Sequence, residues 1–111
     1  MSTAAETIDD VLISNEDDIN RASRSLKAMA HPLRLKILCI LGGGPEVSVH
    51  DIVEKVGTSQ SNISQHLSIL HDKGILASRK RANKVYYRIS DPKILLFIGS
   101  LREAFCRSMK H

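Results

Sequence analysis

The pattern of apolar and polar positions over residues 51–70 predicts two short helices joined by a tight turn. Gly57 interrupts the pattern, and Thr58 or Ser59 can cap a second helix that runs to about Asp72. The apolar positions of this second helix recur at the spacing of one buried face: Ile63, Leu67 and Leu70. We therefore predict a helix-turn-helix.

The other side of this second helix carries short hydroxyl and amide side chains, at Gln60, Ser61, Ser64 and Gln65. A solvated surface helix usually carries Lys and Glu, whereas hydroxyls and amides suit close approach to the base edges of the DNA major groove. We predict that these four residues read bases. The alternative is that the polar side chains on this face are ordinary solvated residues.

Three helices are predicted before Gly57, and the third of them is the first helix of this helix-turn-helix. The first, capped by Ser14, extends to about Ala30 and has one apolar stripe: Ile19, Ala22, Leu26 and Met29. The second starts at Pro32 and should be largely buried, because residues 33–41 contain only two polar positions. Glycines at 42–44 should end it through a left-handed cap. Ser48 caps the third helix, at 49–56.

After the helix-turn-helix, residues 75–80 and 85–90 have strand-type composition and flank four residues at 81–84, which indicates a β-hairpin. The hairpin is strongly basic, and we predict that five of its side chains contact DNA phosphates: Arg79, Lys80, Arg81, Lys84 and Arg88. The alternative is a solvated edge whose charges prevent strand pairing. Helix-turn-helix followed by a basic hairpin is typical of a winged helix.

Asp91 and Pro92 begin a last helix with an apolar stripe formed by Ile94, Ile98, Leu101 and Phe105, which Leu95 widens. A terminal helix this apolar predicts pairing with another subunit. We expect a mainly α fold with a β-hairpin wing, comprising an acidic N-terminal tail at 1–14 and one winged helix-turn-helix domain at 15–111.

Charge and composition narrow the function. The net charge is +4, but all 16 basic residues and only six of the 12 acidic residues lie in 21–111, which therefore carries +10. A region with this positive charge favours binding to nucleic acid or to an anionic membrane. No apolar run approaches the roughly 20 residues of a membrane span, and no signal pattern opens the sequence, so we expect a cytoplasmic protein without membrane contact.

An enzymatic role has little support. The glycines at 42–44 follow a helix and lack the Lys-Ser/Thr pair of a phosphate-binding loop, and no nucleophile and base are recognisable. We expect no catalytic activity and no bound cofactor. A protein-interaction module built on the same scaffold remains an alternative, because fold alone does not set function.

The segment SQSNISQHLSILHDKGIL, preceded by AMAHPLRLKILCIL and followed by KVYYRISD, resembles the ArsR/SmtB family of winged-helix repressors over about residues 19–109. The resemblance implies a homodimer joined by the first and last helices. It also implies binding to double-stranded DNA at an inverted-repeat operator, and release when an inducer is sensed. By motif position, Gln60, Ser61, Ser64 and Gln65 match the family's DNA-facing residues.

The family's usual metal positions are poorly filled. Its cysteine ligands in the third helix fall here on Ser48 and His50, neither of which supplies a thiolate. The positions of its last-helix site are Asp91, Lys93, Ala104 and Arg107, of which only the acid is a ligand. The five histidines, at 31, 50, 66, 71 and 111, form no tight cluster in sequence. We predict no metal site of either kind, and a non-classical metal-sensing site is the alternative.

Two cysteines remain as candidates for the sensor, Cys39 in the second helix and Cys106 near the end of the last. Taken alone they read as small apolar fillers, reduced in a cytosolic setting. Their placement, however, is similar to the thiol-based branch of the family, which includes BigR, SqrR and HlyU. That similarity implies redox sensing, in which reactive sulfur species or an oxidant link the pair by a disulfide or polysulfide bridge and the repressor leaves DNA.

Overall fold

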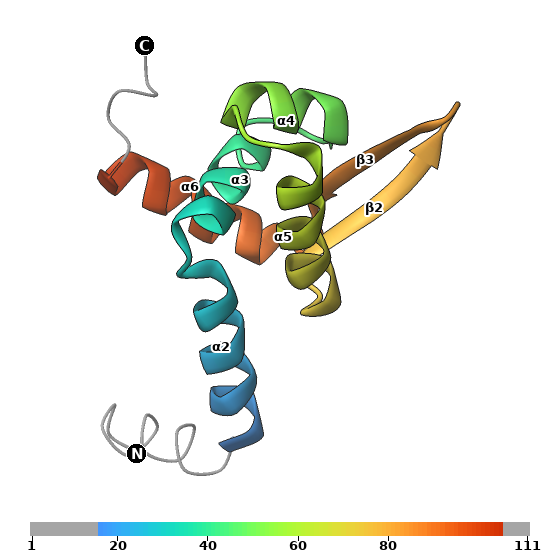
Figure 1. Ribbon diagram of the computed structural model, residues 1–111. Coiled ribbons are helices and arrows are strands. Elements are labelled where there is room, and N and C mark those ends of the chain that lie inside the picture. The colour runs from blue at the N-terminus through green and yellow to red at the C-terminus, as the bar shows by residue number, and fades with distance from the viewer. Residues whose placement is uncertain (1–15, 106–111) are drawn as a thin grey trace, which may run out of the picture.

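A computed structural model describes residues 16–105 as a winged helix-turn-helix, as the sequence predicted (Figure 1). The elements, labelled as in Figure 1, are α2 (Glu16–Met29), α3 (Pro32–Leu41), β1 (Val47–Ser48), α4 (Val49–Val56), α5 (Gln60–Asp72), β2 (Leu76–Arg81), β3 (Lys84–Ile89) and α6 (Pro92–Phe105). Helices α4 and α5 form the helix-turn-helix, and β2 and β3 form the wing. The predicted acidic tail at 1–14 and Cys106 lie outside the described residues.

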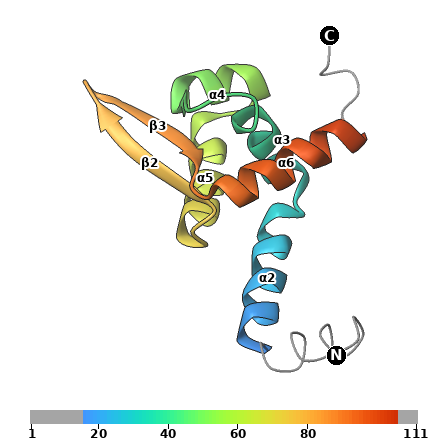
Figure 2. The ribbon, with the colours of Figure 1, turned by 180° about the vertical axis from the view of Figure 1, so that it is seen from behind.

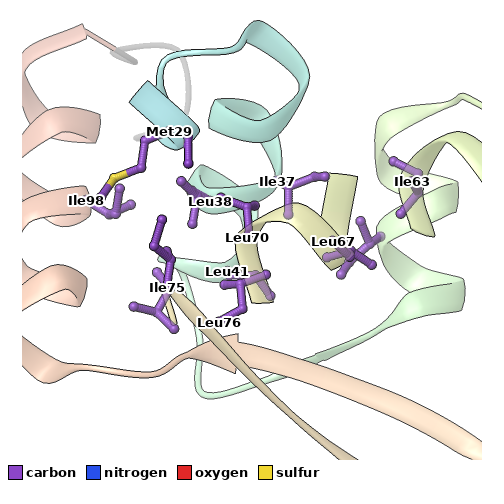
Figure 3. Close-up of a cluster of buried hydrophobic side chains, with 13 residues drawn as sticks. Met29, Ile37, Leu38, Leu41, Ile63, Leu67, Leu70, Ile75, Leu76 and Ile98 are labelled. Carbon is purple, nitrogen blue, oxygen red and sulfur yellow. The ribbon is translucent and has the colours of Figure 1, made fainter. Parts of the chain in front are cut away.

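The core is built around α3, which lies among α5, α6 and the base of the wing (Figure 3). Ile37 and Leu38 of this helix are fully buried. The predicted inner face of α5 is buried against them: Ile63, Leu67 and Leu70. Apolar burial of this kind contributes about 25 cal/mol per Å². The side of α5 that faces away from the core is therefore set by packing within a single chain.

Helices α2 and α6 are much less covered. In α2 only Ala28 and Met29 are buried, while Ile19 and Leu26 of the predicted apolar stripe are 45% and 50% exposed. Helix α6 crosses α3 (Figures 1 and 2). It buries Ile98, yet several of its large apolar side chains remain exposed: Leu95, Leu96, Phe97 and Phe105. None of the helices between residues 16 and 105 has the length and apolar content needed to cross a membrane.

The sheet has a third strand that the sequence did not predict. Its order is β1-β3-β2, all antiparallel, and β1 consists only of Val47 and Ser48. Ser48 pairs with Tyr86 of β3, and its side chain also accepts a hydrogen bond from the Asp51 backbone N–H at 3.1 Å, as the predicted cap of α4. One residue therefore joins the wing to the helix-turn-helix.

The tip of the wing is tighter than predicted. Arg81 pairs with Lys84, so the connection contains two residues instead of four. The two turn residues, Ala82 and Asn83, have positive φ angles of 49° and 69°. Such two-residue turns match the right-handed twist of the strands and favour Asn and Gly. The prediction was wrong because the turn contains no glycine to mark its position.

Gly42 serves close packing, and the predicted left-handed cap is wrong. Gly42 has φ −68° and ψ −12°, a right-handed conformation. A Cβ atom on Gly42 would lie 2.8 Å from Cγ2 of Ile98, and one on Gly43 would lie 3.2 Å from Nη1 of Arg102. Helix α6 thus passes over the end of α3 at a distance that a side chain on Gly42 would obstruct, whereas at Gly43 the neighbour is the end of the flexible Arg102 side chain.

Candidate functional site

The exposed polar side of α5 is oriented by local interactions and by the core. Gly57 takes the left-handed conformation, φ 81° and ψ 30°, that turns the chain between α4 and α5. The Ser59 side chain then caps α5 by accepting a hydrogen bond from the Asn62 backbone N–H at 3.2 Å. All four predicted base-reading side chains are exposed on this helix: Gln60, Ser61, Ser64 and Gln65. Ser68, which the sequence argument did not include, is exposed one turn further along the same face.

A cleft of about 330 Å³ separates the start of α5 from the wing. It is lined by Ser48, Val49, His50, Gln60, Ser64, Asn83, Lys84, Val85 and Tyr87. Two predicted base readers and one predicted phosphate contact thus share one concave surface. His50, Asn83 and Tyr87 were not predicted as members of this surface. Strand-type composition identified the wing, but only the pairing of β1 with β3 brings His50 beside it.

The predicted phosphate contacts of the wing differ in their surroundings. Arg79 is bound by Glu46, with Nη2 2.7 Å from Oε1 and Nε 2.9 Å from Oε2. The hydrogen bond from Arg79 is the main reason that the pKa of Glu46 is lowered, and the pKa of Arg79 is correspondingly raised. Arg81 lies over the ring of Tyr86, with 5.4 Å from Cζ to the ring centroid. The remaining three side chains are exposed: Lys80, Lys84 and Arg88.

A polar cluster attaches α5 to the helices behind it. Arg34 of α3 donates from Nε to the Ala28 carbonyl at 2.5 Å and from Nη1 to Nδ1 of His66 at 3.2 Å. A guanidinium cannot accept, so Nδ1 of His66 is the acceptor and carries no proton. The His31 ring lies 4.6 Å from that of His66, and its own Nδ1 accepts from the Leu33 N–H. Burial first, then the charges of His31 and Arg34, lower the pKa of His66.

Cys39 of the predicted sensor pair is buried, with 6% of its surface exposed. It lines a groove of about 600 Å³ between α3, α4 and α6, together with Pro32, Leu35, Lys36, Ile40, Lys55, Leu101 and Phe105. Phe105 is the last residue that the structure describes, and Cys106 follows it in the sequence. The groove therefore extends from Cys39 to the end of α6, and Cys106 lies outside the described residues.

Three of the family's metal-ligand positions have other contacts in this structure, and a further one, Arg107, lies outside the described residues. Ser48 caps α4, and Nε2 of His50 lies 3.5 Å from Oε1 of Glu54. The Asp91 carboxylate accepts from the Lys93 backbone N–H at 2.8 Å, at the start of α6. Over residues 16–105, no three side chains of His, Cys, Asp or Glu come together as ligands. These contacts account for the acid in the last helix without invoking a metal.

Comparison with known proteins places this geometry among transcriptional regulators. Residues 31–78 match the bacterial regulatory protein family designated arsR. The chain is 37% identical over 86 residues to the HTH-type transcriptional regulator YgaV of Escherichia coli, covering 78% of this chain and 87% of that protein.

Three solved structures extend the likeness. HlyU of Vibrio cholerae matches with a TM-score of 0.78 at 37% identity, covering 82% of this chain and 98% of that one. A structure of reduced HlyU gives a TM-score of 0.77. The transcriptional repressor BigR of Xylella fastidiosa matches with a TM-score of 0.72 at 32% identity, over 82% and 92% of the two chains. These matched proteins regulate transcription and are not enzymes, as the sequence predicted for this chain.

Proposed function

Because the chain belongs to the ArsR family of bacterial regulatory proteins, we propose that it is a homodimeric repressor that binds an inverted-repeat operator and leaves it when Cys39 and Cys106 become linked. The observation that carries the DNA-binding part is the shared cleft, in which Gln60 and Ser64 of α5 face Lys84 of the wing. A double helix that receives α5 in its major groove would present its backbone to that cleft.

The exposed polar face of α5 supports roles in sequence reading for Gln60, Ser61, Ser64 and Gln65. On the wing, Lys80, Arg81, Lys84 and Arg88 supply charge to phosphates, as does Arg79 when it leaves Glu46. His50 and Tyr87 line the same cleft and join the set of backbone contacts.

Exposed apolar residues on α2 and α6 support a dimer. Ile19 and Leu26 on α2, and Leu95, Leu96 and Phe97 on α6, are large apolar side chains that one chain leaves in water. Pairing the two helices of one protomer with those of its partner would remove these side chains from solvent, which favours association. Two-fold symmetry would then present two copies of α5 to half-sites about one helical turn apart.

The DNA-binding proposal is tested with an operator selected by the protein from a random-sequence pool. Gln65→Ala should reduce the preference for that operator over unrelated DNA, because an amide that reads a base carries about 1–3 kcal/mol of discrimination. Lys84→Ala should weaken binding to all sequences and lower the salt slope by about one. Lys93→Ala is the control, because Lys93 is an exposed lysine outside the cleft. Indifference to DNA across salt concentrations would instead support an interaction module.

The sign of regulation is measured separately, because one matched relative, HlyU, is a transcriptional activator. In a reconstituted transcription assay, adding the reduced protein to a promoter that contains the selected operator should lower transcript yield. An increase would contradict repression while leaving DNA binding intact.

For the thiol part, the Cys39 thiolate attacks the outer sulfur of a persulfide R–S–SH. A new sulfur–sulfur bond forms at Cys39 and the original sulfur–sulfur bond of the persulfide breaks. Its electron pair goes to the inner sulfur, which leaves as the thiolate RS⁻. The Cys106 thiolate then attacks Sγ of Cys39 and expels hydrosulfide. The persulfide is the oxidant, since its sulfur is reduced to sulfide while both cysteine sulfurs are oxidised. Each additional persulfide inserts one sulfur atom into the bridge by the same exchange.

The placement of Cys39 in a groove that reaches Phe105 supports this proposal. Intact-mass spectrometry after polysulfide treatment should show a Cys39–Cys106 link that appears as the operator is released. Cys39→Ser and Cys106→Ser should each retain operator binding under reducing conditions and lose release by polysulfide. Release that persists in Cys39→Ser would contradict the thiol switch while leaving the repressor proposal standing.

A further inference from the structure

The groove beside Cys39 has features of a small-molecule site, independent of the thiol chemistry proposed above. Its volume of about 600 Å³ falls within the roughly 300–1,000 Å³ of ligand pockets. Its walls come from three helices: Leu35 and Ile40 from α3, Lys55 from α4, and Leu101 and Phe105 from α6. Five of its eight lining residues are apolar side chains other than cysteine. Such walls favour the body of an apolar ligand.

The polar residues of the groove have one sign. Lys36 from α3 and Lys55 from α4 both line it and both are exposed. No carboxylate belongs to the lining. Among residues 16–105, neither lysine lies within ion-pair distance of an acidic side chain. Two ammonium groups at an apolar groove, without a carboxylate to neutralise them, are complementary to a ligand with an apolar body and an anionic head.

We propose that this groove binds a small amphipathic anion, a carboxylate with a hydrocarbon chain. The chain lies against Leu35, Ile40 and Leu101, and the carboxylate lies between the ammonium groups of Lys36 and Lys55. Cys39 is covered by the bound chain, because its side chain belongs to the same groove. The proposal depends on the groove and its charges and does not depend on whether Cys39 forms a bridge.

A ligand at this position touches the support of the DNA-reading helix. Helix α4 supplies Lys55 to the groove and also packs against α5 through the common core that contains Ile52 and Ile63. A ligand that bridges α3 and α4 therefore favours one relative placement of the two helices. Occupancy should both slow modification of Cys39 and change operator affinity, which makes the groove a second input to the same regulator.

The test uses Cys106→Ser, in which Cys39 is the only cysteine of the chain. Decanoate is the probe, used below its micelle threshold, and decyltrimethylammonium is the probe of equal tail and opposite charge. Isothermal titration calorimetry should give saturable binding of one decanoate per chain. Alkylation of Cys39 by iodoacetamide, followed by intact mass, should slow about tenfold at ten times the dissociation constant. Decyltrimethylammonium should bind more weakly and protect less.

The charge requirement is tested with Lys36→Glu/Lys55→Glu in the same background. Decanoate affinity should fall by about tenfold, within the limit of about 25-fold that follows if each of two exposed ion pairs contributes up to about 1 kcal/mol, a factor of about five. The matched control, Lys93→Glu/Lys27→Glu, reverses two exposed lysines outside the groove and should leave decanoate affinity unchanged.

Three results would overturn the proposal. Equal binding of the two probes would show detergent-like adsorption to apolar surface. An unchanged affinity in the Lys36→Glu/Lys55→Glu protein would place decanoate elsewhere. Absence of any calorimetric binding, with no protection of Cys39, would show that a part of the protein itself fills the groove. Where Cys39 resists alkylation even without ligand, the calorimetric comparison of the two lysine pairs decides alone.

Discussion

Helices α5 and α2 are both amphipathic, but only the apolar face of α5 is fully buried within the same chain. The inner side chains of α5 are fully packed, with Leu67 at 1% exposed, whereas Leu26 of α2 remains half exposed. Helix α5 is also fixed at its start by Ser59 and along its length by the hydrogen bond from Arg34 to His66. The orientation of α5 is thus a property of the folded chain, whereas α2 keeps exposed apolar side chains that the proposed dimer would cover.

The largest expected effect tests the internal anchoring of α5. Leu67→Ala should lower the free energy of unfolding by about 3 kcal/mol, because it removes a buried side chain and leaves a cavity. Urea denaturation followed by circular dichroism measures the loss. Ser68→Ala, at the exposed neighbouring position, should change stability by less than about 0.5 kcal/mol. Similar values for the two variants would show that α5 is not anchored by this face.

The next effect concerns α2. Leu26→Asp should raise the dimer dissociation constant by about thirtyfold, which corresponds to about 2 kcal/mol at an interface anchor. Sedimentation equilibrium measures the dissociation constant. Asn20→Asp introduces the same charge at an exposed position on another side of α2 and should preserve the dimer. A Leu26→Asp protein that remains as dimeric as the parent would remove α2 from the interface and weaken the contrast with α5.

A smaller effect isolates the local start of α5. Ser59→Ala should cost about 1 kcal/mol of stability, because it removes the side chain that caps the helix. Ser61→Ala is the matched control, since the Ser61 hydroxyl lies 3.5 Å from that of Ser59 and caps no backbone N–H in the described part of the chain. Thermal unfolding of the three proteins side by side gives the difference. Equal losses for Ser59→Ala and Ser61→Ala would argue against a specific cap.

The smallest expected effect is a pH dependence at the junction of α5 with α3. The pKa of His66 is lowered from 6.5 in the folded chain, so the unfolded chain binds this proton first. Above pH 6.5, the free energy of unfolding should not depend on the protonation of His66. It should fall as the pH decreases through 6.5 towards the lower pKa of the folded chain. The slope from one proton is below about 1.4 kcal/mol per pH unit. His66→Gln should remove this part of the slope, measured by urea denaturation from pH 7.5 to about 5. An unchanged slope would show that the pH dependence comes from other groups.

Much of the reading helix could be predicted from sequence because its signals are local. Gly57, the cap at Ser59 and the spacing of Ile63, Leu67 and Leu70 all lie within one stretch of chain and agree with each other. Contacts with distant parts of the chain were therefore not needed to predict this helix. The same holds for the existence of the wing, which its strand composition indicated.

Features that depend on distant partners could not be predicted. Strand β1 has two residues and exists only because it pairs with Tyr86 and Tyr87. Gly42 looked like a helix terminator, and its role in accommodating Ile98 depends on a contact between positions far apart in sequence. Arg79 belonged to a basic run, yet its guanidinium is held by Glu46, 33 positions earlier. Composition identifies charges, whereas only the fold shows which of them are already neutralised.

Ser48 has a mechanical consequence. Because this single residue is both a rung of the sheet and the cap of α4, the wing and the helix-turn-helix have no hinge between them at this point. Each protomer should therefore move as one unit, in which the spacing between α5 and the wing tip is held constant. In the proposed dimer, a change in the separation of the two protomers would therefore move both DNA-binding surfaces without deforming either of them.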